Sequence, residues 1–140
     1  MNPNPLIGVW KLVSADVITG DDVSYPLGKE ANGYLIYTEN GYMSAITTSA
    51  NRPKFASGDS MRASAEEALE AVKTCVAYSG KYEIRGDKVI HHVAASFLPN
   101  WTGGRQERFF VLVDGRLKLS TPPTLVHGKL QIARLLWERV

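Results

Sequence analysis

The chain has 140 residues, a length that suits one domain. It carries 16 basic and 14 acidic residues, a net charge of +2, and so lacks the basic excess of a nucleic-acid-binding protein. Its hydrophobic fraction of 44% is ordinary for a globular protein, and no run approaches the roughly 20 apolar residues of a membrane span. We therefore expect a single domain over residues 1–140, with no nucleic-acid partner and no membrane span.

The cysteine content and the start of the chain bear on its compartment. Cys75 is the single cysteine, so no disulfide can form within the chain. Small secreted domains usually depend on disulfides. The start, Met1–Pro5, is a Pro/Asn lead-in without the basic and apolar regions of a signal peptide. The sequence therefore favours a cytoplasmic location.

The first part of the chain alternates apolar and polar side chains at the period of a β-strand. Residues 6–18 form the first predicted strand, which ends at Thr19–Asp22. Residues 33–38 and 42–48 are rich in aromatic and β-branched side chains, and Asn40-Gly41 lies between them. This dipeptide favours a tight hairpin turn, so the second and third strands are predicted to pair.

One helix is predicted over residues 64–77, after an irregular loop at 49–63. Ser64 and Glu67 have the spacing of a capping box, in which each side chain binds the backbone N–H of the other residue. Apolar side chains recur on one face, at Ala65, Ala68, Leu69, Val72 and Val76. An apolar face predicts that the helix lies against another element, with Cys75 buried beside it.

Five further strands are predicted, over residues 79–85, 88–97, 105–113, 116–121 and 128–139. Short turns join most of them. Eight antiparallel strands, with one helix inserted after the third, favour a closed up-and-down barrel, which has no exposed edges and room for one small ligand. A two-layer sandwich is the alternative, which the short connections disfavour.

His91 is the main candidate for chemistry inside such a barrel. On its strand, Val89, His91 and Val93 form the more apolar face, so His91 is predicted to point inward and His92 outward. A neutral imidazole can donate and accept hydrogen bonds, which suits either a ligand contact or a core residue. Because neighbouring histidines face opposite sides and His127 lies in a loop, we expect no metal site and no other cofactor.

Aromatic side chains are further candidates for a pocket. Trp101 lies on the connection between two predicted strands, where it can stack on a ring at the barrel mouth or act as a plug. Tyr37, Tyr78 and Tyr82 each combine an apolar ring with one polar group, but the strand register leaves their orientation open. Met43 suits the core better than a ligand contact, yet it remains a candidate.

Several segments resemble motifs of the lipocalin-like domain family of bacteria and fungi. They are Gly8-Val9-Trp10, residues 33–38, Asn40–Ser44, Arg52–Asp59, His91-His92-Val93, Pro99-Asn100-Trp101, Gln106 with Arg108, and Leu136–Arg139. The resemblance runs from about Leu6 to Val140 and implies a mainly β, calycin-type barrel. It implies no settled activity: some barrels of this kind bind hydrophobic compounds, and a minority act as isomerases or cyclases.

The resemblance also implies roles for individual residues. In the calycin pattern, Trp10 plugs one end of the barrel beneath a stacked arginine, which here is Arg139 or Arg134. The family pattern places Gln106 and Arg108 inside. An inward Arg108 needs a partner for its charge, and beside His91 it could polarise a carbonyl. The alternative is that Arg108 extends to the barrel rim.

Three functions remain open at this point. In the first, the barrel binds a small hydrophobic or aromatic molecule, whose polar end meets His91, Trp101, Gln106 and Arg108. In the second, the same pocket catalyses an isomerisation or cyclisation, with His91 as general acid/base and Arg108 as the electrophilic group. In the third, the protein's own side chains fill the barrel. The helix or a strand face could also form a homodimer.

Overall fold

A computed structural model describes residues 4–140, so the first three residues of the Pro/Asn lead-in lie outside the described residues. Residues 4–140 form ten strands: β1 Gly8–Thr19, β2 Asp22–Ser24, β3 Asn32–Tyr37, β4 Tyr42–Thr48, β5 Cys75–Arg85, β6 Lys88–Ser96, β7 Arg105–Val113, β8 Arg116–Ser120, β9 Thr124–Val126 and β10 Lys129–Arg139. One α-helix, α1 Ala65–Lys73, and two short 3-10 helices, Ser60–Arg62 and Pro99–Trp101, complete the fold.

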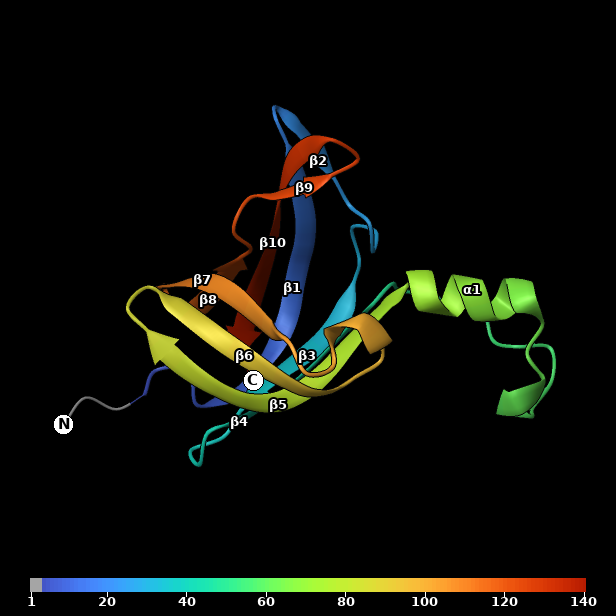
Figure 1. Ribbon diagram of the computed structural model, residues 1–140, viewed down its shortest axis with the longest axis horizontal. Coiled ribbons are helices and arrows are strands. Elements are labelled where there is room, and N and C mark those ends of the chain that lie inside the picture. Colours follow the sequence, from blue (N-terminus) through green and yellow to red (C-terminus); the bar gives the residue numbers. More distant parts are fainter. Residues whose placement is uncertain (1–3) are drawn as a thin grey trace.

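The strands close into an antiparallel barrel. Each long strand pairs with its neighbour in the chain, and β1 pairs with β10 along most of its length, from Trp10 opposite Arg139 to Thr19 opposite Gln131. This last pairing closes the barrel through eight strands and excludes the sandwich. The short strands β2 and β9 extend β1 and β10 at one end (Figure 1). The predicted eight-stranded barrel is therefore confirmed.

The strand β6 carries a bulge at Ala94, where its backbone approaches β5 closely. The register between β5 and β6 shifts between Ser79 and Gly80. A Cβ atom at Gly80 would overlap the carbonyl oxygen of His92 on the neighbouring strand. Only glycine allows this approach, so Gly80 lets the two strands stay paired on both sides of the bulge.

The helix differs from the prediction in length and in packing. It ends at Lys73, and residues 75–78 instead pair with β4, so Cys75 is a buried residue of a strand and not of the helix. None of the helix side chains is buried, and α1 extends away from the barrel in Figure 1. The expected contact between its apolar face and another element is therefore wrong for the described residues.

Local hydrogen bonds explain how α1 forms without that packing. Ser64 Oγ accepts from the Glu67 backbone N–H at 3.1 Å, and Glu67 Oε1 accepts from the Ser64 N–H at 2.9 Å, so the predicted capping box is confirmed. These bonds, with a third from the Ala56 N–H, lower the pKa of the Glu67 carboxyl. At the other end, Arg52 donates to Thr74 Oγ1 and to the Ala71 carbonyl.

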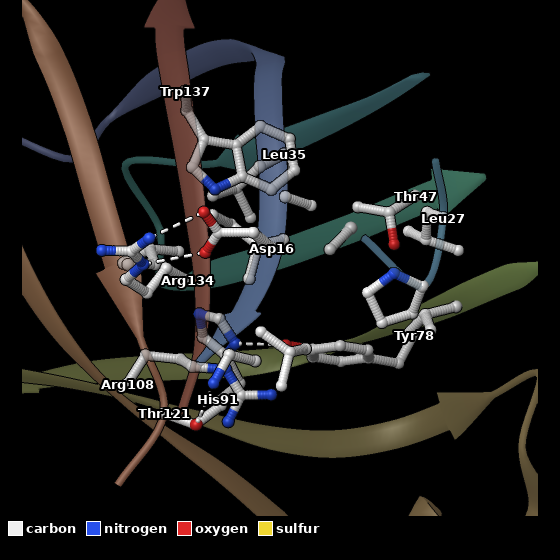
Figure 2. Close-up of a pocket in the computed structure, with 18 of the residues that line it drawn as sticks. Asp16, Leu27, Leu35, Thr47, Tyr78, His91, Arg108, Thr121, Arg134 and Trp137 are labelled. Atoms are coloured by element: carbon white, nitrogen blue, oxygen red, sulfur yellow. Dashed lines mark hydrogen bonds and ion pairs between the residues drawn. The ribbon is translucent and has the colours of Figure 1, made fainter. Parts of the chain in front are cut away.

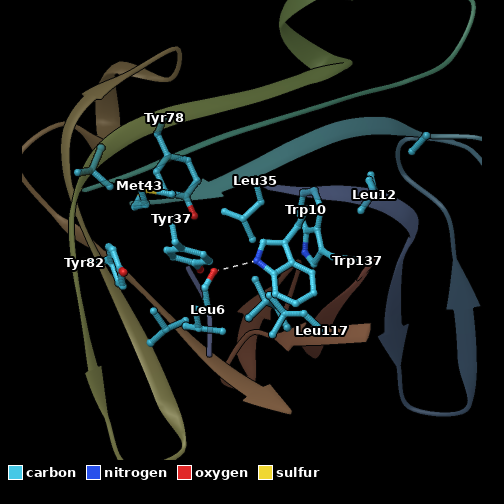
Figure 3. Close-up of a cluster of buried hydrophobic side chains, with 14 residues drawn as sticks. Leu6, Trp10, Leu12, Leu35, Tyr37, Met43, Tyr78, Tyr82, Leu117 and Trp137 are labelled. Carbon is cyan, nitrogen blue, oxygen red and sulfur yellow. Dashed lines mark hydrogen bonds between the residues drawn. The ribbon is translucent and has the colours of Figure 1, made fainter. Parts of the chain in front are cut away.

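The two ends of the barrel interior differ in how they are filled. At one end, large side chains pack together (Figure 3), including Leu6, Trp10, Tyr37, Tyr82, Leu117 and Trp137. Trp10 is fully buried and its Nε1–H donates to the Leu6 carbonyl at 2.9 Å.

All helices of residues 4–140 are too short or too polar to span a lipid bilayer.

Candidate functional site

A cavity of about 280 Å³ occupies the other end of the barrel (Figure 2). Apolar side chains make up most of its wall, among them Leu27, Leu35, Ala45, Val76, Leu119 and Leu135. Three alanines on three strands, Ala15, Ala45 and Ala133, line it where larger residues would fill the space. The cavity therefore exists because these inward positions carry small side chains.

A buried chain of three polar side chains lies at the inner end of this cavity. His91 on β6 is 1% exposed, and both of its ring nitrogens meet a tyrosine hydroxyl. Tyr37 Oη lies 2.6 Å from Nε2, and Tyr78 Oη lies 2.7 Å from Nδ1. Tyr78 and His91 line the cavity, whereas Tyr37 lies behind them in the core. The strands β3, β5 and β6 each contribute one member of the chain.

Burial sets the charge state of this chain. Burial is the largest cause that lowers the pKa of His91 from 6.5 to about 3, and Arg108 and His92 contribute less to the same shift. Burial is also the largest cause of the raised pKa values of the Tyr37 and Tyr78 hydroxyls. At neutral pH the imidazole and both phenols are therefore uncharged.

Counting protons assigns the direction of each hydrogen bond. A neutral imidazole has one N–H and one lone pair, so one tyrosine donates to it and the other accepts from it. Within residues 4–140, Tyr37 Oη has His91 as its hydrogen-bond partner, and its hydroxyl proton would be buried unpaired unless it points to Nε2. An unpaired buried donor costs about 1–3 kcal/mol. The same cost would fall on Tyr78 if its proton were unpaired, but Tyr78 lines the cavity and Tyr37 does not, so its proton has an acceptor within reach when the cavity is filled. We therefore assign Tyr37 as the donor to Nε2, and the Nδ1–H of His91 as the donor to Tyr78.

Arg108 reaches the cavity wall from β7 and is partly buried. Its Nη1 donates to the Glu107 carbonyl at 2.8 Å and its Nη2 to Gln106 Oε1 at 3.2 Å. No carboxylate within residues 4–140 forms an ion pair with it. Gln106 lies outside this cavity, on a second hollow of about 470 Å³ that shares Trp101 and Arg108. Gln106 lies opposite His91 in the sheet and shares its face, and it orients Arg108 from this second hollow.

Trp101 lies at the junction of the two hollows. It ends the 3-10 helix Pro99–Trp101 and lines both the barrel cavity and the outer hollow. Its ring meets the Tyr78 ring edge-to-face, with 5.5 Å between centroids. This contact holds Tyr78 between Trp101 on one side and His91 on the other.

Besides Gln106, three of the expected pocket residues are absent from the cavity wall. Tyr37, Tyr82 and Met43 point into the barrel but belong to the packed core and are absent from the cavity wall. Tyr82 donates to the Thr38 carbonyl at 2.9 Å and accepts from Asn4 Nδ2 at 2.8 Å. The strands bring these side chains to the correct face but at the filled end of the barrel, so Tyr78 is the tyrosine that lines the cavity.

Sequence reasoning missed a polar group on the terminal strands. Asp16 on β1 pairs with Arg134 on β10, with N–O distances of 2.8 and 2.7 Å, at the cavity wall (Figure 2). Trp137 on β10 lines the same cavity and is 2% exposed. Within residues 4–140 its Nε1 has no hydrogen-bond partner. The register of the closing strands brings these residues together. Trp137 belongs to the segment Leu136–Arg139 and Arg134 is one of the two candidates to cover Trp10, but no spacing in the sequence predicts their place at the cavity.

The closed end of the barrel contains Trp10 and Arg139. The guanidinium carbon of Arg139 lies 4.1 Å from the centroid of a Trp10 ring. Its Nη1 and Nη2 donate to the carbonyls of Ile7 and Pro5 at 2.7 and 2.8 Å. A Cβ atom at Gly8 would lie 2.7 Å from Arg139 Nη1, so the glycine leaves space for the arginine. Arg139, not Arg134, therefore covers Trp10.

The described residues contain no cluster of three or more side chains able to hold a metal ion. His92 faces outward and its Nε2 lies 2.8 Å from Glu83 Oε1. This contact and the nearby Arg85 lower the pKa of the Glu83 carboxyl. The side chains of His91 and His92 therefore lie on opposite faces of the sheet.

Comparison with known proteins identifies the family. The sequence matches the model of the lipocalin-like domain over residues 7–140. A 4'-hydroxy-3'-methoxypropiophenone carrier protein of Aspergillus oryzae is 30% identical over 107 residues, which are 70% of this chain and 96% of that protein.

Two solved structures are similar to this barrel over nearly the whole chain. A lipocalin-like protein of Bacteroides uniformis has a TM-score of 0.48 at 14% identity, covering 98% of this chain and all of that one. An uncharacterised protein of Bacteroides eggerthii has a TM-score of 0.46 at 12% identity, covering 96% and 99%. The family model, with its match over nearly the whole sequence, shows that this chain belongs to the lipocalin-like domain family.

Proposed function

We propose that this protein binds and carries one small aromatic compound in its barrel cavity. The observation that carries the proposal is the cavity of about 280 Å³ with a largely apolar wall and few polar groups, the composition expected of a small-molecule site. A dry cavity of about 150 Å³ holds benzene. The volume here therefore suits a single ring with substituents.

The polar groups of the cavity would orient such a ligand. Trp101 and Tyr78 offer aromatic surfaces at one side of the cavity. Arg108, which forms no ion pair within residues 4–140, brings a positive charge to its wall. His91 acts through Tyr78, since both ring nitrogens already have partners. The name of the Aspergillus relative, a carrier of an aryl ketone, supports the same class of ligand for this chain.

The state of His91 also bears on the choice between binding and catalysis. Isomerisation or cyclisation with His91 as general acid/base requires a ring nitrogen that can reach the ligand. Here Tyr37 and Tyr78 occupy both nitrogens, and the low pKa of about 3 makes the imidazole a weak base. These features favour a binding role for this pocket.

Titration with 4'-hydroxy-3'-methoxypropiophenone, followed by tryptophan fluorescence, tests the proposal. Trp101 and Trp137 both line the cavity, so binding should change the emission with one ligand per chain. Filling the cavity with Ala45→Phe should lower the affinity at least tenfold, because a phenyl ring takes the ligand's volume.

The matched control is Ala94→Phe, which adds the same ring at an exposed position on β6. It should bind as the unaltered protein does. An equal loss in both variants, or binding that persists in Ala45→Phe, would place the ligand elsewhere and overturn the proposal.

A further inference from the structure

The cavity wall contains a hydrogen-bond donor that no group among residues 4–140 satisfies. The Nε1 of Trp137 is buried and, among residues 4–140, has no partner. In Figure 2 this nitrogen lies on the edge of the indole that faces Asp16 and the cavity. Both Asp16 oxygens accept from Arg134 instead. Buried polar groups are nearly always paired, so this N–H calls for an acceptor within the cavity.

A second donor follows from the His91 chain. His91 donates its Nδ1–H to Tyr78 Oη, as assigned above, so the Tyr78 hydroxyl keeps its own proton free. Tyr78 lines the cavity and its ring is held by Trp101 and His91. The hydroxyl proton of Tyr78 is therefore available to a ligand in the cavity. Tyr37 sets this arrangement, because its own donation to Nε2 places the imidazole proton on Nδ1.

We propose that Trp137 Nε1–H and Tyr78 Oη–H are the specificity-determining groups of the cavity, and that they select aromatic ligands with two acceptor oxygens, such as an alkyl aryl ketone with an ether or hydroxyl on the ring. This inference rests on the proposed binding function and specifies its ligand class. A ligand oxygen at each donor completes a buried hydrogen bond. A hydrocarbon of the same shape leaves both donors unpaired, which a site of this kind rejects.

A pair of isosteric probes measures the two donors directly. The probes are 4'-methoxypropiophenone, with a carbonyl and an ether oxygen, and 1-ethyl-4-propylbenzene, in which one methylene replaces the carbonyl group and another replaces the ether oxygen. Calorimetric titration of the full chain gives the affinity for the ketone divided by the affinity for the hydrocarbon. Trp137→Phe and Tyr78→Phe each remove one donor and keep an aromatic ring.

Each variant should lower this ratio about tenfold, the usual effect of one buried hydrogen bond. The ratio cancels any loss of affinity due to changed packing, which affects both probes. Tyr34→Phe, at an outward and exposed position of β3, is the matched control and should keep the ratio of the unaltered protein. Unchanged ratios in both donor variants would overturn the inference.

A measurement on the unaltered protein covers the case in which Trp137→Phe does not fold. The indole N–H signal of Trp137 in a ¹⁵N–¹H spectrum should move downfield with the ketone and much less with the hydrocarbon. A signal that responds equally to both probes contradicts the proposed bond. Failure of the unaltered protein to bind either probe overturns the proposed function itself, whereas binding with equal affinity for both probes overturns only this inference.

Discussion

Acid should destabilise this barrel through His91. The imidazole is buried between two tyrosine hydroxyls, and Arg108 is the charged group on its cavity side. A second proton on the ring would break the bond from Tyr37, because Nε2 could no longer accept. It would also place a positive charge in an apolar interior near another cation. For these reasons the folded protein resists protonation of His91 down to a pKa of about 3.

The size of the effect follows from linkage between protonation and folding. The unfolded chain takes up a proton on His91 near its ordinary pKa of 6.5, whereas the folded chain does so only near 3. Between these values the unfolded state binds more protons, so stability is full above pH 6.5 and falls as the pH drops. At pH 4.5, about two units below 6.5, the loss is about 3 kcal/mol, since each pH unit corresponds to roughly 1.4 kcal/mol.

Urea unfolding at pH 7 and pH 4.5 checks this value against a His91→Gln variant. The glutamine amide can still donate to one tyrosine and accept from the other, but it does not titrate. Exposed carboxylates such as Glu67 and Glu83 titrate alike in both proteins and cancel in the comparison. The unaltered protein should lose about 2–3 kcal/mol more than the variant over this range. Equal losses would refute the buried neutral imidazole.

Three further substitutions test the frame of the barrel. Arg139→Ala should lower the free energy of unfolding by about 1–3 kcal/mol, measured in urea, since it removes the cation over Trp10 and two hydrogen bonds to carbonyls; Arg139→Lys should recover only part. Gly80→Ala should cost more than about 2 kcal/mol, or prevent folding, because its Cβ meets the His92 carbonyl; an unchanged thermal midpoint would contradict the bulge geometry. Ser64→Ala should cost about 1 kcal/mol of local helix stability, seen as faster amide exchange in α1, while global unfolding stays the same.

The sequence predicts the barrel well because its strands depend on local signals. Alternation of apolar residues and the turn at Asn40-Gly41 locate the long strands to within a few residues. Strands β2 and β9 have three residues each, too few for any period to appear. They are visible only as partners of β1 and β10 in the closed structure.

The end of the helix shows how tertiary pairing overrides local pattern. Val72 and Val76 have helical spacing, but Val76 is also a β-branched residue that suits a strand. Pairing of Thr48 with Cys75 and of Thr47 with Val76 provides backbone partners on β4 that a longer helix would forgo. The strand therefore starts directly after Thr74.

The residues of the cavity wall are harder to predict. Such a residue must face the barrel interior and must also lie at the right height along the barrel axis. The sequence leaves the orientation of Tyr78 and Tyr82 on β5 open, and in the structure both are buried. Which of them reaches the cavity depends on the tilt and stagger of the strands, and no single strand encodes these. The same reason hides Asp16 and Trp137, since only the register of β1 with β10 brings them to one cavity.

The hydrogen-bonded side chains of Tyr37, His91 and Tyr78 lie at the boundary between the filled and the open end of the barrel. The partners available to their protons differ between the two ends. On the core side, Tyr37 must use its proton within the protein, because no water or ligand is expected among the packed rings there. This demand fixes the imidazole as the Nδ1–H form, which leaves the proton of Tyr78 for the cavity. The substitution Tyr37→Phe would remove this hydroxyl proton, so the His91 imidazole could also adopt its other neutral tautomer. The selectivity of the cavity is therefore set in part by a residue that never touches the ligand.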